Sequence, residues 1–144
     1  MTNLKLAVVG AGVFGRNHVR VLSRLPNVEL IAVIDSDFGK AQQLAAEHGT
    51  QAFDSLSAIP AIDAAIVATP TVSHEEVATW LLEAGIDILV EKPIAISAAA
   101  GERLARLAVR LAMQPEAKDK RTLAISTLLD KTEMPAARIS SGIV

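Results

Sequence analysis

A glycine-rich segment between an apolar run and a helical stretch is the feature that most constrains the fold. The run 4–9 is apolar apart from Lys5, which is typical of a strand buried on both faces of a parallel sheet. The segment Gly10-Ala11-Gly12-Val13-Phe14-Gly15 follows directly, and residues 13–25 then have apolar helical faces. Glycines at this spacing permit a tight turn and close packing of a helix on a strand. The sequence therefore predicts a strand–turn–helix unit.

The rest of the chain repeats this alternation of strand and helix. Apolar runs at 28–34, 51–53, 63–68 and 86–90 alternate with helical stretches at 37–48, 73–84 and 97–113. We expect Ser73 and Glu76 to form a capping box and Ser97 to cap the last helix. Such alternation is typical of βαβ units, so we predict an α/β fold of the Rossmann type with a doubly wound parallel sheet.

The periodicity places a domain boundary near residue 113. We predict one dinucleotide-binding domain over residues 1–113, ending with the last helix. Residues 114–121 are charged and read as a linker, residues 122–125 as one more short strand, and the remainder to 144 as a tail that is poorly structured or bound by a partner.

Composition excludes several classes of function. The chain has no cysteine, which rules out a disulfide scaffold, a cysteine nucleophile and a thiolate metal site; we expect no metal. The net charge is -2 without a run of Lys or Arg, which argues against binding to nucleic acid or anionic lipid. The first apolar run is too short to span a membrane, so we expect a soluble, cytoplasmic protein.

The glycine segment and an acidic residue together predict a dinucleotide site. Gly12 lets the backbone approach a pyrophosphate, and the N-terminus of the following helix favours its negative charge. Asp35 lies twenty residues beyond Gly15, where a carboxylate accepts hydrogen bonds from ribose hydroxyls and repels a 2′-phosphate. Ser36 follows in place of an arginine, so NAD is favoured over NADP. The alternatives are that Asp35 only caps the helix 37–48, or that the chain is a methyltransferase.

Two further clusters follow the fourth and fifth predicted strands. Thr69, Pro70, Thr71 and His74 come after one strand, and Glu91-Lys92-Pro93 after the other. Because ligands of open α/β sheets bind at the carboxyl ends of the strands, both clusters should border the cofactor. Lys92 could then exchange a proton with a substrate hydroxyl. The alternatives are an exposed His74 and a surface Lys92 paired with Glu91. We expect His18 to be a helix-packing or solvent residue, and Trp80 to lie in the core rather than to serve as a stacking platform.

Taken together, four segments of the chain resemble the Gfo/Idh/MocA oxidoreductase family. They are GAGVFGRNH, VID at 33–35, ATPTVSH at 68–74 and ILVEKPIA at 88–95. The sequences of the last two segments are similar to those of the branch that acts on nucleotide-linked sugars, such as UDP-N-acetylglucosamine 3-dehydrogenase. The resemblance implies hydride transfer between NAD(H) and a hydroxyl or ketone carbon of a sugar or cyclitol. It also implies a cis Lys92–Pro93 bond, with Lys92 as the catalytic residue. The cofactor-binding residues would be Gly10, Gly12, Val13, Phe14, Gly15, Asp35, Thr69, Pro70, Thr71, His74, Glu91, Lys92 and Pro93.

The chain departs from the family pattern after Arg110. Family members continue into a mostly β domain that carries the substrate pocket and a catalytic histidine, but this sequence has no histidine beyond His74 and no phenylalanine beyond Phe53. We therefore expect the C-terminal substrate domain to be absent and the chain to be weakly active or inactive alone, taking a sugar or nucleotide-sugar substrate only where that domain is supplied. The alternative is a non-enzymatic dinucleotide-sensing or dimerisation module. An uncovered sheet edge predicts a homo-oligomer.

Overall fold

A computed structural model of the chain describes residues 2–113. Its helices and strands alternate as the sequence predicts. In chain order they are β1 (Leu4–Val9), α1 (Val13–Leu22), β2 (Val28–Ile34), α2 (Phe38–His48), β3 (Gln51–Phe53), the 3₁₀ helix η1 (Leu56–Ala58), β4 (Ala64–Val67), the 3₁₀ helix η2 (Thr71–Ser73), α3 (His74–Glu83), β5 (Asp87–Val90) and α4 (Ala98–Ala112).

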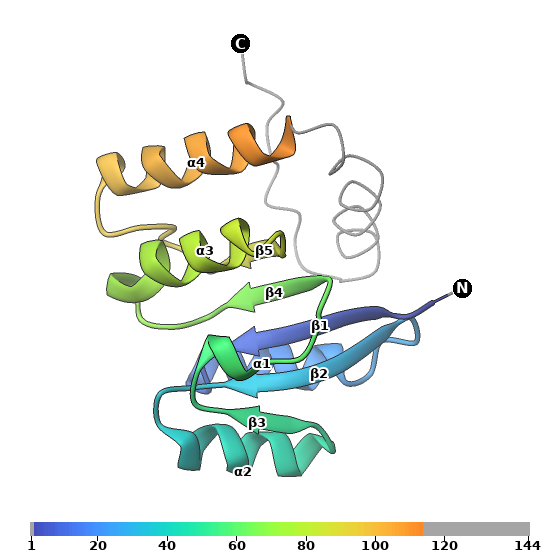
Figure 1. Cartoon of the computed structure of the whole chain (residues 1–144). Coiled ribbons are helices and arrows are strands. Elements are labelled where there is room, and N and C mark those ends of the chain that lie inside the picture. Colours follow the sequence, from blue (N-terminus) through green and yellow to red (C-terminus); the bar gives the residue numbers. More distant parts are fainter. Residues whose placement is uncertain (1, 114–144) are drawn as a thin grey trace.

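The five strands form one parallel sheet in the order β3-β2-β1-β4-β5 (Figure 1). The chain builds outward from β1 to β3 and then returns to the other side of β1 with β4. The strand order therefore reverses between β1 and β4, which is the switch point where ligands of doubly wound sheets bind. This topology confirms the predicted α/β Rossmann class.

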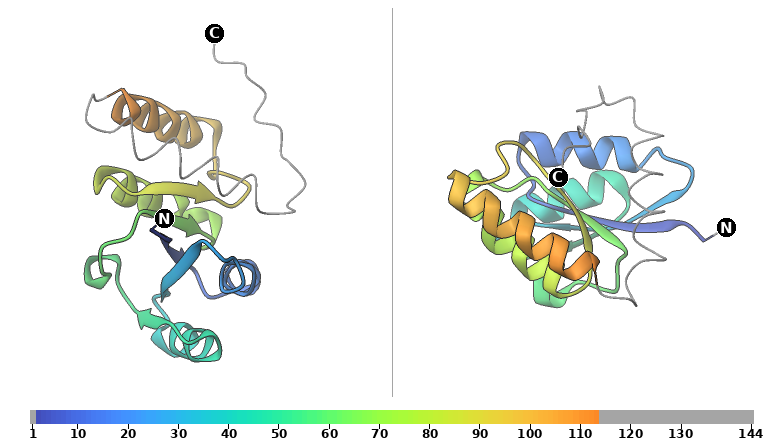
Figure 2. Two further views of the ribbon diagram at one scale, coloured as in Figure 1. Left: turned by 90° about the vertical axis from the view of Figure 1, so that its right-hand side faces the viewer. Right: turned by 90° about the horizontal axis from the view of Figure 1, so that it is seen from above.

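The sheet is buried between two apolar layers. Helices α1 and α2 cover one face, where they pack on Leu6 and Val8 of β1. Helix α3 and the segment around η1 cover the other face, where they pack on Ala7 and Val9. Helix α4 lies alongside α3 (Figure 2). Because successive residues of β1 point to opposite faces, only an unbroken apolar strand satisfies both layers.

Two expectations about α3 are wrong. Ser73 makes no side-chain capping bond. It is the last residue of η2, which holds its backbone in helical geometry, with φ -97° and ψ -7°. An N-cap residue needs extended backbone instead. Trp80 is 39% exposed rather than part of the core, since it lies on the outer side of the helix.

The other helix boundaries follow the sequence closely. Ser97 caps α4, and its Oγ accepts a hydrogen bond from the Ala100 N–H at 3.2 Å. The predicted linker, the strand at 122–125 and the tail lie outside the described residues. Among the helices of residues 2–113, none combines the length and the apolar character needed to cross a membrane.

Candidate functional site

The predicted site residues follow strands that end side by side. Backbone pairing continues one residue past these strands: the N–H groups of Gly10, Ala68 and Glu91 donate to the last residue of a neighbouring strand at 2.7, 2.7 and 2.9 Å. All the strands are parallel, so their carboxyl ends share one edge of the sheet. The structure therefore brings together the glycine segment, the turn after β4 and the Glu91-Lys92-Pro93 segment.

The three glycines of the first turn differ in how much room the structure leaves for a side chain. Gly10 has φ +106°, and a Cβ there would lie 2.5 Å from the carbonyl oxygen of Ala68. At Gly15 a Cβ would lie 1.7 Å from the carbonyl oxygen of Gly10, so α1 packs on the turn too closely for any side chain. A Cβ on Gly12 would meet nothing within 4 Å. The fold therefore requires Gly10 and Gly15, but it leaves open space in front of Gly12.

The N-terminus of α1 is open to a ligand. Its N-cap is Gly12, which has no side chain to bond the first N–H groups, and the first turn carries no acidic residue. The first bond within the helix is from Arg16 N to Gly12 O, at 2.9 Å, so the N–H groups before Arg16 have no helical acceptor. Val13 and Phe14, 77% and 61% exposed, lie in this turn. Free N–H groups and the positive end of the helix dipole together form an anion site.

Asp35 orders the glycine turn from the end of β2. Its Oδ2 accepts a hydrogen bond from Ala11 N and its Oδ1 accepts one from Asp37 N, both at 2.8 Å. The cap of α2 is Asp37, whose side chain accepts from Lys40 N. The alternative reading of Asp35 as that cap is therefore wrong. Each carboxylate oxygen keeps a second lone pair, which ribose hydroxyls can use.

His74 joins the two clusters that follow β4 and β5. The side chain is 1% exposed, so the alternative of an exposed residue is wrong. Its Nε2 lies 2.8 Å from the carbonyl oxygen of Thr69, and its Nδ1 lies 3.0 Å from that of Pro93. Thr71 belongs to η2, beside the exposed Pro70. The hydroxyl oxygen of Thr69 is buried and has no partner among residues 2–113.

Lys92 extends from the end of β5 into solvent. Among residues 2–113 its ammonium forms no ion pair, so the alternative of a surface pair with Glu91 is wrong. Glu91 instead bonds Nε2 of His18 through Oε1, at 2.5 Å, and accepts the Lys92 N–H through Oε2, at 3.3 Å. The Lys92–Pro93 peptide bond is cis, as the resemblance implies. Lys92 thus has a side chain available for a ligand.

Sequence reasoning missed the contact between His18 and Glu91, because it assigned His18 to helix packing or to solvent. The sequence did contain a sign of this contact, because His18 ends the family-like segment GAGVFGRNH, about one helical turn after Gly15. Its partner lies 73 residues away, a separation that periodicity alone does not bridge.

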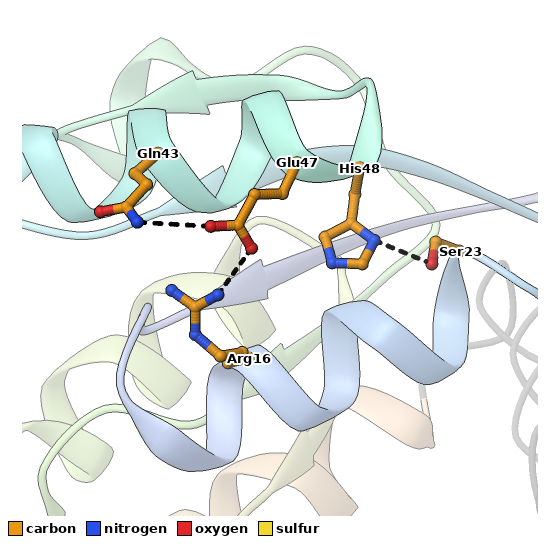
Figure 3. A network of polar contacts seen from close by, with 5 residues as sticks. All are labelled: Arg16, Ser23, Gln43, Glu47 and His48. Atoms are coloured by element: carbon orange, nitrogen blue, oxygen red, sulfur yellow. Dashed lines mark hydrogen bonds and ion pairs between the residues drawn. The ribbon is translucent and has the colours of Figure 1, made fainter.

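A separate polar network joins α1 to α2 (Figure 3). Arg16 donates to Glu47 at 2.6 Å, and Gln43 donates to the same carboxylate at 3.3 Å. At the other end of α1, the Ser23 hydroxyl lies 3.1 Å from Nδ1 of His48. The Arg16 guanidinium is therefore directed toward α2.

Comparison with known proteins identifies the family and supports the fold. A family described as "Oxidoreductase family, NAD-binding Rossmann fold" matches residues 4–114. The chain belongs to the Gfo/Idh/MocA oxidoreductase family. The open turn, the strand-end carboxylate and the Lys92 segment thus occur in a domain whose family binds NAD, which confirms the predicted cofactor.

Relatives of this Gfo/Idh/MocA chain are named as dehydrogenases of inositol and of UDP-N-acetylglucosamine. Inositol 2-dehydrogenase 1 of Saccharopolyspora erythraea is 39% identical over 102 residues, which cover 67% of this chain and 30% of that protein. UDP-N-acetylglucosamine 3-dehydrogenase of Acidithiobacillus ferrooxidans is 32% identical over 109 residues, which cover 75% and 34%.

Among solved structures, GenD2 from gentamicin A biosynthesis, in complex with NAD, is similar with a TM-score of 0.74 and 34% identity, covering 78% of this chain and 33% of GenD2. The chain spans about a third of the length of the curated relatives described above. It is an NAD-binding oxidoreductase domain related to sugar and cyclitol dehydrogenases.

Proposed function

We propose that NAD(H) binds along the carboxyl edge of the sheet and that Lys92 acts on a sugar or cyclitol beside it. The observation that carries this proposal is the open space at Gly12, in front of an uncapped helix N-terminus. Within residues 2–113 no neighbouring atom requires a glycine there, whereas a pyrophosphate that approaches the backbone does. The residues present therefore fit the cofactor.

Each cluster has a distinct task in this proposal. The first turn of α1, with Gly12, Val13 and Phe14, holds the pyrophosphate through its N–H groups. Asp35 accepts the ribose hydroxyls and disfavours a 2′-phosphate. The remaining residues border the nicotinamide end; they are Thr69, Pro70, Thr71, His74, Glu91, Lys92 and Pro93.

The reaction is the interconversion of a secondary alcohol and a ketone. NAD held by these residues would supply the hydride acceptor for the alcohol carbon, and NADH would supply the hydride donor for the reverse reaction. In oxidation the hydroxyl proton passes to the neutral Lys92 amine as the carbon–oxygen double bond forms. In reduction the Lys92 ammonium donates that proton back to the oxygen. We propose weak or no turnover by these 144 residues alone, because the chain spans about a third of its relatives.

Calorimetric titration tests the cofactor site. We expect NAD to bind with a dissociation constant in the micromolar to millimolar range and NADP to bind more weakly. Absence of NAD binding, or preference for NADP, would contradict the proposed site. Formation of NADH absorbance with myo-inositol or UDP-N-acetylglucosamine then measures turnover, and Lys92→Met should abolish any rate while NAD still binds. A rate that Lys92→Met leaves unchanged would remove Lys92 from the mechanism.

A second candidate is a dinucleotide-sensing module that assembles through its sheet edge. Within the described residues β5 is an edge strand, and its four residues are only half-buried. A strand at the edge of a sheet can pair with a strand of another chain. We propose a homo-oligomer on this basis, and a monomer in light scattering with and without NAD would contradict it. We also propose a cytoplasmic location, which cell fractionation tests.

A further inference from the structure

His18 is the buried polar side chain of α1, and none of the steps above uses it. It is 8% exposed, and its Nε2 donates to Oε1 of Glu91 at 2.5 Å. We propose that His18 is a positioning residue, which acts through Glu91 to place Lys92 relative to the N-terminus of α1. The inference rests on the proposed function, since that function makes Lys92 the proton-transfer group and the start of α1 the pyrophosphate site.

Three hydrogen bonds hold Glu91, so it can fix the position of Lys92 relative to α1. Oε1 bonds His18, Oε2 accepts the N–H of Lys92 at 3.3 Å, and its own N–H donates to Val67 O of β4 at 2.9 Å. The side chains of His18 and Glu91 are 10% and 16% exposed. Water competes little at such a place, and hydrogen bonds to a carboxylate are among the stronger ones. The pair therefore orients the backbone of Lys92 from the side of α1.

His18 lies on the helix that packs directly against the glycine turn. Gly15 packs against Gly10 so closely that no Cβ fits between them, and His18 follows Gly15 by about one helical turn. β5, by contrast, lies at the edge of the sheet within residues 2–113, and its residues are half-buried. The bond from His18 thus fixes the spacing between the anion site and Lys92 more firmly than β5 does alone.

Substitutions in the full chain separate positioning from general stability. His18→Leu removes the donor, whereas His18→Gln keeps an N–H donor at the end of a side chain of similar reach. His48→Leu is the matched control, because it also removes an imidazole contact to α1, at Ser23, but far along the chain from Lys92. The readouts are amide hydrogen exchange at Lys92 without ligand, and calorimetric affinities for NADH and for ADP-ribose, which lacks the nicotinamide.

We expect His18→Leu to speed exchange of the Lys92 amide about fivefold or more, as the loss of one hydrogen bond predicts. NADH affinity should fall about fivefold more than ADP-ribose affinity, His18→Gln should recover most of both effects, and His48→Leu should show neither. Where thermal unfolding shows that His18→Leu does not fold, Glu91→Gln gives the same comparison with its size preserved.

Three results would overturn the role of His18. They are unchanged exchange at Lys92, an equal loss of NADH and ADP-ribose affinity, or no recovery by His18→Gln. A wild-type chain that binds neither ligand would instead refute the proposed function. In that case the exchange comparison still decides whether His18 is coupled to Lys92, so the two failures are distinguishable.

Discussion

Gly12→Ala is expected to weaken NAD binding about tenfold or more while leaving the fold intact. Its φ is -76°, a value that any L-residue adopts, and the added Cβ meets no atom within 4 Å. Alanine at an N-cap is unfavourable, but replacing glycine also lowers the entropy of the unfolded chain, so the net change in unfolding free energy should stay within about 1 kcal/mol. The methyl group instead occupies the space of the pyrophosphate. Loss of one charged hydrogen bond, about 1.5–3 kcal/mol, lowers NAD affinity about tenfold or more.

Gly15→Ala is the comparison variant for Gly12→Ala, because it adds the same methyl group at a position where the fold has no room for it. The Cβ would lie 1.7 Å from Gly10 O, whereas real contacts stay above 3.0 Å, so α1 and the turn must separate by at least about 1.3 Å. We expect a loss of about 3 kcal/mol or more of unfolding free energy, a large share of the roughly 5–15 kcal/mol of a typical domain.

Urea denaturation followed by circular dichroism measures both stabilities, and calorimetry measures NAD binding by the folded variants. The expected pattern is a stable Gly12→Ala that binds NAD about tenfold or more weakly, and a destabilised Gly15→Ala. A Gly12→Ala chain that binds NAD with wild-type affinity would refute the assignment of that space to the pyrophosphate. Equal destabilisation by the two variants would refute the distinction between them.

Three other substitutions test separate parts of the structure. Asp35→Ala should weaken NAD about tenfold or more, reduce the preference over NADP, and cost about 1–2 kcal/mol of stability because two backbone N–H groups lose their acceptor; calorimetry and urea denaturation measure these effects. His74→Leu should cost about 1–3 kcal/mol, since one or two part-buried carbonyl groups lose a donor, and an unchanged urea midpoint would contradict this. The hydrogen bonds from Arg103 hold the pKa of Glu75 below its ordinary value. The pair therefore stabilises the fold above the ordinary glutamate range and loses this as pH falls through the lowered pKa. The difference between wild type and Arg103→Gln should shrink over that interval in denaturation curves at stepped pH.

The fold could be predicted because local signals and the sheet agree. Unbroken apolar runs such as 4–9 require burial on both faces, and the glycine segment allows only a tight turn into a helix. The exceptions concern geometry that spacing does not encode. Ser73 and Glu76 have the spacing of a capping box, but Ser73 belongs to a 3₁₀ helix that was not predicted, so its backbone is not extended. Trp80 is apolar by type and yet lies on the outer face of its helix.

The sequence predicted which strand ends form the site, but it did not predict the side-chain contacts that connect those strand ends. Topology brings parallel strand ends together whatever follows them, so the clusters at Asp35, His74 and Lys92 could be named from their positions alone. Which partner each side chain takes depends on the packing between clusters. The buried ring of His74 spans the two turns after β4 and β5, and spacing alone left it equally open to solvent.

Asp35 shows why a signature residue has more than one reason to be present. The sequence assigns it to ribose, yet the structure also makes its carboxylate the acceptor for the Ala11 N–H inside the glycine turn. A carboxylate that shapes the turn before ligand arrives lowers the ordering cost of binding, because the N–H groups of α1 are already directed outward. It follows that NAD affinity and turn stability are coupled at this position, whereas at Gly12 they are independent. Asp35→Asn separates the two roles: an amide still offers one oxygen acceptor to Ala11 but carries no charge against a 2′-phosphate. That variant should therefore keep more stability than Asp35→Ala while losing a similar share of the discrimination against NADP.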